Sequence, residues 1–186
     1  MTKKTMLDRL PLNDALFIGF CAGSMIVCKL LFRWHLGING HAMFFTVALL
    51  MLARGCVNYR WAASLTALLA GLMAMSIGLG KGGPLIVLKF LFPALVIDLA
   101  ALLVPLFFYS VTGCMIVAAM AGASKFINSW LKGYLLGMDR IVLFQQSALD
   151  AFFALLFSCL GALFIPSILR KLKARGVFVQ PQQGGE

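Results

Sequence analysis

Long apolar runs, interrupted only by short polar segments, constrain this chain more than any other feature. Of its 186 residues, 62% are hydrophobic and 12% are charged, whereas soluble domains carry about 25% charged residues. A transmembrane helix needs about 20 consecutive apolar residues, and the length of the chain accommodates about six of them joined by short loops. We therefore expect an all-α polytopic membrane protein with about six transmembrane helices in one compact bundle.

Turn-forming and polar residues divide the apolar sequence into six predicted spans. A glycine-rich segment over residues 78–84 ends the third span, and the long stretch after it divides near Pro105, because proline interrupts a helix. The predicted spans are residues 14–33, 38–54, 61–79, 84–105, 107–125 and 147–169. They form a transmembrane domain over residues 1–172, and residues 173–186 are a basic and then disordered tail.

The first apolar segment resembles a signal peptide, because Lys3, Lys4 and Arg9 precede it. However, the segment is long and has no A-x-A cleavage site, and the bulky Phe20 before Cys21 makes a poor lipoprotein site. We expect it to remain in the protein as the first span.

Lysine and arginine are distributed unequally between the two sides that six spans define. The side with both termini holds nine of them, the other side holds five, and Lys29 and Lys89 fall within spans. Because cytoplasmic loops carry an excess of basic residues, both termini are predicted to be cytoplasmic. The net charge of +10 lies between apolar runs rather than in a solvated stripe, so we expect contact with lipid headgroups and no binding of nucleic acid.

Two charged residues lie within the predicted fourth span. Asp98 is near its middle, where an ionised carboxylate costs at least about 2.5–3.5 kcal/mol on insertion scales. Lys89 lies about 13 Å away along a helix, which is too far for a direct pair. An intramembrane carboxylate indicates a functional site or a structural ion pair in the bundle core, and Lys89 either joins such a site or extends to the interface.

Further polar residues gather on the predicted outer side of the membrane. They are His35, Asn39, His41, Lys81, Lys125, Asn128, Ser129 and Trp130. Ligand pockets combine apolar walls with a few convergent polar groups. This rim is therefore interpreted as a vestibule for a small molecule with a negative group, and a hydrated interfacial belt is the alternative.

Signatures of metal sites and of enzymes are missing from the sequence. The five cysteines contain no CxxC pair, and two histidines without nearby cysteine or carboxylate are a weak metal signal. There is no HExxH, GxSxG or P-loop motif, and the glycines of residues 78–83 do not fit a dinucleotide-binding pattern. We expect no enzyme activity, no metal and no cofactor.

Ala15, Gly19 and Gly23 form a ladder of small residues at intervals of four in the first span. Such a ladder lets another helix approach closely. That helix could belong to the same chain or to a partner subunit.

The layout resembles the substrate-binding S components of energy-coupling factor (ECF) transporters. The matching features are the chain's size, six spans with both ends inside, the ladder of Ala15, Gly19 and Gly23, and the passage from residues 82–87 to the acidic Asp98. The stretch 118–128 that closes the fifth span is also similar. The resemblance covers nearly the whole chain as a pattern rather than as a diagnostic motif.

This resemblance implies a high-affinity subunit that captures a vitamin or related micronutrient outside a prokaryotic inner or plasma membrane. Import then requires a T component and two ATPase subunits, and the small-residue ladder would dock on the T component. The implied ligand-binding residues are Lys89, Asp98, Asn128 and Trp130, with His41 and Lys81 on loops. The basic residues on the outer side depart from the pattern for a cationic ligand and favour an anionic or zwitterionic one.

Two other functions fit the same residues. One is a self-contained secondary carrier or small channel that uses Asp98 as a proton or cation site. The other is a structural subunit of a larger membrane complex, in which Asp98 pairs with a neighbour.

Overall fold

The computed structural model is entirely helical in the part of the chain that it describes, which comprises residues 11–33, 41–57, 59–78, 85–104, 108, 110–135, 137 and 139–174. The six helices of this part are α1 (Leu12–Arg33), α2 (His41–Cys56), α3 (Ala62–Ser76), α4 (Leu85–Leu103), α5 (Val111–Leu135) and α6 (Arg140–Ala174). The all-α class and its six helices therefore agree with the sequence prediction.

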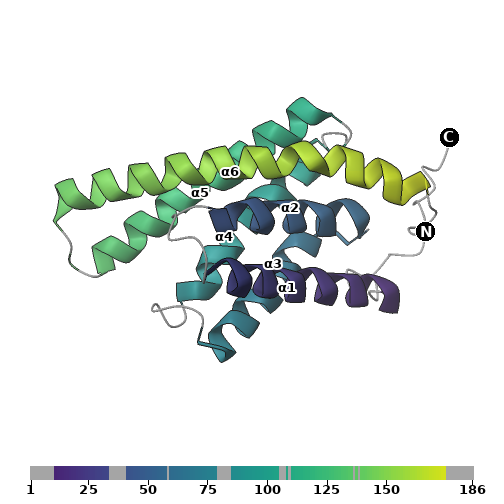
Figure 1. Cartoon of the computed structure of the whole chain (residues 1–186), viewed down its shortest axis with the longest axis horizontal. Coiled ribbons are helices and arrows are strands. Elements are labelled where there is room, and N and C mark those ends of the chain that lie inside the picture. Colours follow the sequence, from purple (N-terminus) through teal and green to yellow (C-terminus); the bar gives the residue numbers. More distant parts are fainter. Residues whose placement is uncertain are drawn as a thin grey trace, which may run out of the picture.

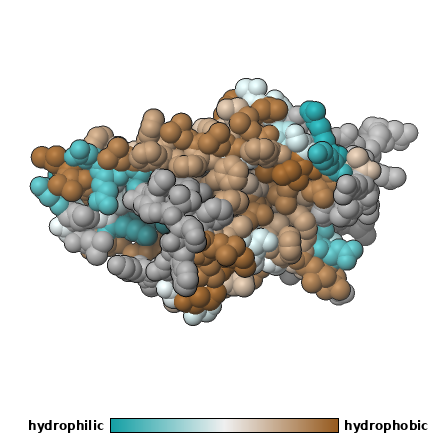
Figure 2. Space-filling model, in the orientation of Figure 1, coloured by the Kyte–Doolittle hydropathy of each residue, from teal (hydrophilic) through white to brown (hydrophobic). Residues whose placement is uncertain are grey.

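Four of these helices, α1, α4, α5 and α6, are long and apolar enough to cross a membrane. The other two, α2 and α3, are apolar but have only 16 and 15 residues. Hydrophobic residues cover the middle of the molecule in Figure 2, and hydrophilic residues gather towards its two ends. This distribution suits a helical membrane protein, because lipid tails favour an apolar surface and headgroups favour polar ends.

The α5–α6 hairpin supports one side of the bundle. α5 packs along α6, and α2 also packs on α6, while α3 contacts α4 and α1 contacts α2 and α3. The start of α1 and the end of α6 lie at one end of the molecule, and the α5–α6 connection lies at the other end (Figure 1). Fully buried Leu50, Met51, Ile97 and Ile165 fill the space between these helices.

Glycines allow the closest helix contacts inside the bundle. A Cβ atom built on Gly161 of α6 would lie 2.7 Å from the carbonyl oxygen of Phe44 in α2, which is closer than real Cβ atoms approach. One built on Gly122 of α5 would lie 3.1 Å from the carbonyl oxygen of Ala154 in α6, which is tighter than most such contacts. The backbones therefore pack directly against each other, as small residues permit in membrane bundles.

The α5–α6 hairpin is longer than the predicted fifth and sixth spans. α5 continues to Leu135 instead of ending near residue 125, and α6 begins at Arg140 instead of near residue 147. Polar residues mark where a helix leaves the hydrocarbon, but they do not end the helix. With 35 residues, α6 is about 52 Å long, which exceeds the roughly 30 Å hydrocarbon thickness. The hairpin extends beyond α1 and α2 in Figure 1.

Candidate functional site

Asp98 is fully buried and lies against the first turn of α3. Its Oδ2 atom accepts hydrogen bonds from the backbone N–H of Ser64 at 2.8 Å and from the Ser64 hydroxyl at 2.6 Å. Its Oδ1 atom accepts a third hydrogen bond, from the backbone N–H of Ala63 at 3.3 Å. The carboxylate therefore satisfies backbone donors that a helix N-terminus leaves without partners.

This contact replaces a missing local cap. Trp61 stands at the N-cap position of α3 and makes no side-chain cap hydrogen bond. Asp98 supplies the carboxylate from another helix, and its negative charge interacts favourably with the positive end of the α3 dipole. It thereby joins α3 to α4.

Arg54, in the last turn of α2, completes the surroundings of Asp98. Its Nε atom lies 3.3 Å from Asp98 Oδ1, and its side chain is only 15% exposed. The structure thus gives Asp98 the neutralising partner that a carboxylate in a membrane bundle requires. Within the described residues, Arg54, Ser64 and Asp98 form an internal brace between α2, α3 and α4.

Lys89 belongs to a different polar cluster, nearer the α5–α6 connection. We call Lys89 of α4, Lys125 and Lys132 of α5, and Asp150 of α6 the lysine cluster. Lys89 is partly buried and interacts electrostatically with the other three charges. Lys125 and Lys132 are seven residues apart, so they lie on the same face of α5, two turns from each other.

Three polar residues of this region are buried without a hydrogen bond from their side chains. Lys125 is 9% exposed, Asn128 is 6% exposed and Ser147 is 1% exposed. Among the described residues, none of the three has a hydrogen bond from its side chain, and neither Lys89 nor Lys125 has an ion pair. The exception in the cluster is Asp150, whose Oδ2 accepts a hydrogen bond from Ser129 at 3.3 Å.

Native proteins satisfy most buried polar groups, so a group of unsatisfied ones needs an explanation. An uncompensated charge in a membrane helix also costs several kcal/mol at the hydrocarbon centre and less near its edge. Here the fully buried group without a hydrogen-bond partner is the Ser147 hydroxyl. The side chains of Lys89, Lys125 and Asn128 form no hydrogen bond among the described residues, and most of these groups are donors. The arrangement is suited to a ligand with several hydrogen-bond acceptors.

Pro93 leaves a backbone carbonyl oxygen of α4 without its usual helical donor. Pro93 lies inside α4 and is buried. Because proline has no N–H, the carbonyl oxygen of Lys89, four residues earlier, loses its usual helical donor. Lys89 therefore offers both an ammonium group and a backbone acceptor.

Trp130 lies in an aromatic group rather than in the lysine cluster. Its ring stacks on Phe126 with centroids 5.8 Å apart and meets the edge of Phe144 at 6.3 Å. The side chain is 37% exposed. Among the other predicted binding residues, His41 is the first residue of α2 but its side chain lies outside the described part, as does the whole of Lys81.

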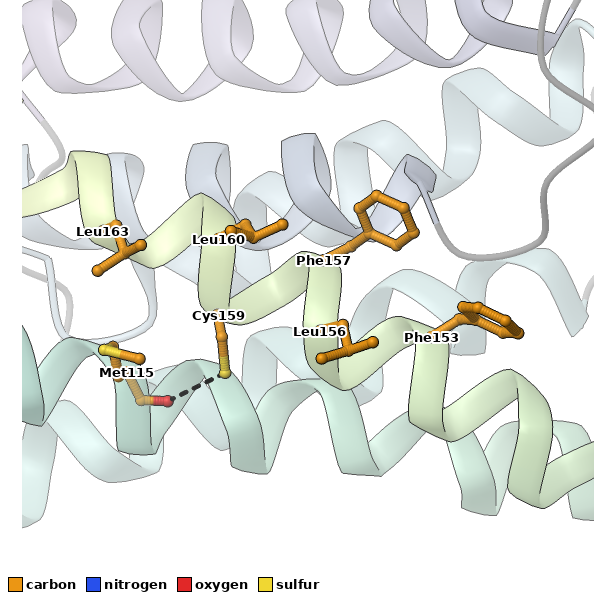
Figure 3. A pocket seen from close by; sticks show the side chains of 7 residues that line it. All are labelled: Met115, Phe153, Leu156, Phe157, Cys159, Leu160 and Leu163. Carbon is orange, nitrogen blue, oxygen red and sulfur yellow. Dashed lines mark hydrogen bonds between the residues drawn. The ribbon is translucent and has the colours of Figure 1, made fainter.

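A separate groove of about 510 Å³ runs along the outer face of α5 and α6. Its lining is apolar and consists of Met115, Phe153, Leu156, Phe157, Cys159, Leu160 and Leu163 (Figure 3). The Cys159 Sγ atom lies 3.9 Å from the Met115 carbonyl oxygen, which it approaches as a weak donor. Such a surface suits lipid chains and has no group that could recognise a polar nutrient.

The small-residue ladder of α1 does not pack within the described bundle. Ala15 and Gly19 are exposed and Gly23 is partly buried. A Cβ atom on Gly19 or on Gly23 would meet nothing within 4 Å. This differs from Gly122 and Gly161, which are enclosed by neighbouring helices.

Sequence reasoning grouped Asp98 with Lys89 and Asn128, but the structure divides them between the brace and the lysine cluster. It also missed Asp150, although this residue is, like Asp98, a carboxylate inside a predicted span. Lys125, Asn128 and Lys132 are three and four residues apart in turn, which is the spacing of one helix face. That pattern becomes visible only once residues 125–135 are known to be helical.

Comparisons with known proteins found no relative of this chain. The chain matches no protein-family model, no curated protein and no solved structure.

Proposed function

We propose that this chain is a membrane-embedded binding subunit that captures a small anionic nutrient, in the manner of an ECF S component. One observation carries the proposal: Lys89, Lys125 and Asn128 come from α4 and α5 into one polar cluster of an otherwise apolar bundle, and their side chains have no hydrogen bond or ion pair among the described residues. A ligand that supplies negative charge and acceptors would satisfy them.

The proposed topology has six crossings with both termini in the cytoplasm of a prokaryote. The lysine cluster then lies towards the outer surface, because the α5–α6 connection is at the end of the molecule opposite the start of α1 (Figure 1). α2 and α3 cross as short helices within the bundle, where α4 and α6 cover part of their surfaces. A vitamin-like molecule would enter from outside.

The proposed partners are a T component and two ATPase subunits. The chain has no phosphate-binding loop of its own, so ATP-driven import requires ATPase subunits. The ladder of Ala15, Gly19 and Gly23, of which the first two are exposed and the third is partly buried, supports α1 as the docking helix, because another helix can approach it closely.

Native mass spectrometry tests this function. The full chain is purified in mild detergent from cells that express it, so that bound small molecules and partner subunits are retained. We expect a retained small molecule, and we expect its loss in the double variant Lys89→Gln/Lys125→Gln. The matched control is Lys171→Gln, which removes an exposed lysine at the other end of α6. Copurification of ATPase subunits would support the transporter assignment.

Two results would contradict the proposed nutrient site. If the wild-type chain retains no small molecule, or if the double variant retains it as well as the control does, the lysine cluster is not a nutrient site. Transport of a solute by liposomes that contain this chain alone, abolished by Asp98→Asn, would instead establish the secondary carrier.

A further inference from the structure

The charge balance of the lysine cluster restricts the ligand beyond its being an anion, and this inference rests on the proposed function. Three ammonium groups, on Lys89, Lys125 and Lys132, face one carboxylate, on Asp150. Two positive charges are left without compensation by the described residues. We infer that the ligand presents a doubly charged oxyanion, such as a phosphate monoester, to the lysines of α4 and α5.

The positions of the lysines suit one compact group. Lys125 and Lys132 are separated by seven residues on one face of α5, or about 10 Å along the helix axis. Lys89 approaches from α4, which packs against α5. Long lysine side chains can converge across such a distance, so all three ammonium groups can reach one oxyanion.

The uncharged groups nearby also favour an acceptor-rich ligand. Asn128 lies on α5 between the two lysines, and its buried amide has no partner among the described residues. Ser147 of α6 lies between Leu143, whose side chain packs on Gly133, and Asp150, which accepts from Ser129. Its buried hydroxyl is also unsatisfied. Both can donate to an oxyanion, which only accepts.

The surroundings of Asp150 favour a doubly charged oxyanion over a zwitterionic ligand. A zwitterion would place its own ammonium against Asp150 and its carboxylate against the lysines. Asp150 already accepts from Ser129 and interacts with Lys89 and Lys125. Asp150 therefore neutralises part of the lysine charge, and it repels the bound anion.

A phosphate monoester could come from a soluble nutrient or from the headgroup of phosphatidic acid. Counting about 20 residues of span back from Leu169 places Asp150 at the outer edge of the hydrocarbon. At this depth the cluster is accessible to both sources. The shared chemistry is the doubly charged phosphate, and the experiment distinguishes where it comes from.

The test measures binding of two matched probes to the full chain in phosphatidylcholine nanodiscs at pH 7. Phenyl phosphate carries mostly two negative charges at this pH, because the second pKa of a phosphate monoester is about 6, and benzenesulfonate carries one on a similar ring. We expect phenyl phosphate to bind at least tenfold more tightly. Lys89→Gln and Lys125→Gln should each remove most of this preference, whereas Lys171→Gln should keep it.

Asp150→Asn gives the second readout, because asparagine still accepts from Ser129 but has no charge. We expect phenyl phosphate to bind several-fold more tightly to this variant, and a loss of tenfold or more would overturn the inference. Competition by phosphatidic acid, but not by phosphatidylglycerol, would identify a lipid headgroup as the source of the phosphate. No competition by either lipid would identify a soluble ester.

Equal affinity for the two probes would also overturn the inference. The proposed function would survive that result if the chain still retained a native molecule of another charge that depended on Lys89 and Lys125. Both proposals would fail if neither the retention of a native molecule nor the affinity for either probe depended on these two lysines.

Discussion

Asp98 of α4 and Ser64 of α3 are joined by two hydrogen bonds at the first turn of α3, one from the backbone N–H and one from the hydroxyl. The same carboxylate pairs with Arg54 of α2. A residue whose position in the sequence suggests a transport site therefore holds three helices together. A structural ion pair is one of the two interpretations that the sequence allows for Asp98, and the structure contains such a pair with Arg54.

Asp98→Ala should destabilise the chain by about 3–5 kcal/mol, because it leaves Arg54 as an uncompensated buried charge and removes the cap of α3. Ser64→Ala removes one hydrogen bond to the carboxylate and should cost about 1.5–3 kcal/mol. Thermal unfolding in detergent measures both. An unchanged unfolding temperature for Asp98→Ala would contradict the brace.

Gly122→Val should disrupt the contact of α5 with α6, because its new Cβ atom would lie 2.5 Å from the Ser158 hydroxyl oxygen. Overpacking of this kind costs about 1–3 kcal/mol. Gly19→Val is the matched control, since the same substitution meets nothing within 4 Å on α1. Unfolding of the isolated chain measures the difference, and equal losses would contradict the packing.

The same pair of variants separates folding from partner binding. If α1 docks on a T component, Gly19→Val should reduce copurification of the ATPase subunits while leaving the stability of the isolated chain nearly unchanged. Full recovery of the complex with Gly19→Val would show that the ladder of Ala15, Gly19 and Gly23 is not the docking surface.

Lys125→Met should stabilise the ligand-free chain while weakening ligand binding. The substitution keeps the apolar stem of the side chain but removes a buried charge that has no ion pair among the described residues. We expect a gain of about 1 kcal/mol or more in the free energy of unfolding. Thermal unfolding with and without added ligand measures both effects. A destabilised ligand-free variant would mean that Lys125 has a structural role.

The orientation of the chain can be tested by cysteine labelling, in a variant from which the five native cysteines have been removed. Lys132→Cys and Lys171→Cys lie near opposite ends of the α5–α6 hairpin. A membrane-impermeant maleimide added to intact cells should label the first position only, because the proposed topology places the end of α6 in the cytoplasm. Labelling of Lys171→Cys alone would show that the chain has the opposite orientation.

Most of the fold could be predicted from apolar segments and their interruptions, because lipid imposes helical structure on any apolar chain long enough to cross it. The first four helices consequently lie close to their predicted spans. The extension of α5 to Leu135 could not be predicted in this way. Lys125, Asn128 and Lys132 signal departure from the hydrocarbon, and tertiary packing against α6 keeps this polar stretch helical.

The sequence by itself determined the all-helical class and the long apolar segments, because hydrophobicity acts on each segment separately and does not depend on which helices meet. Only the tertiary structure decided what the charged residues contact. Asp98 and Lys89 share α4, yet one caps α3 and the other joins charges on α5 and α6. A side chain's partners depend on helix rotation and packing, and these arise from contacts between residues far apart in the chain.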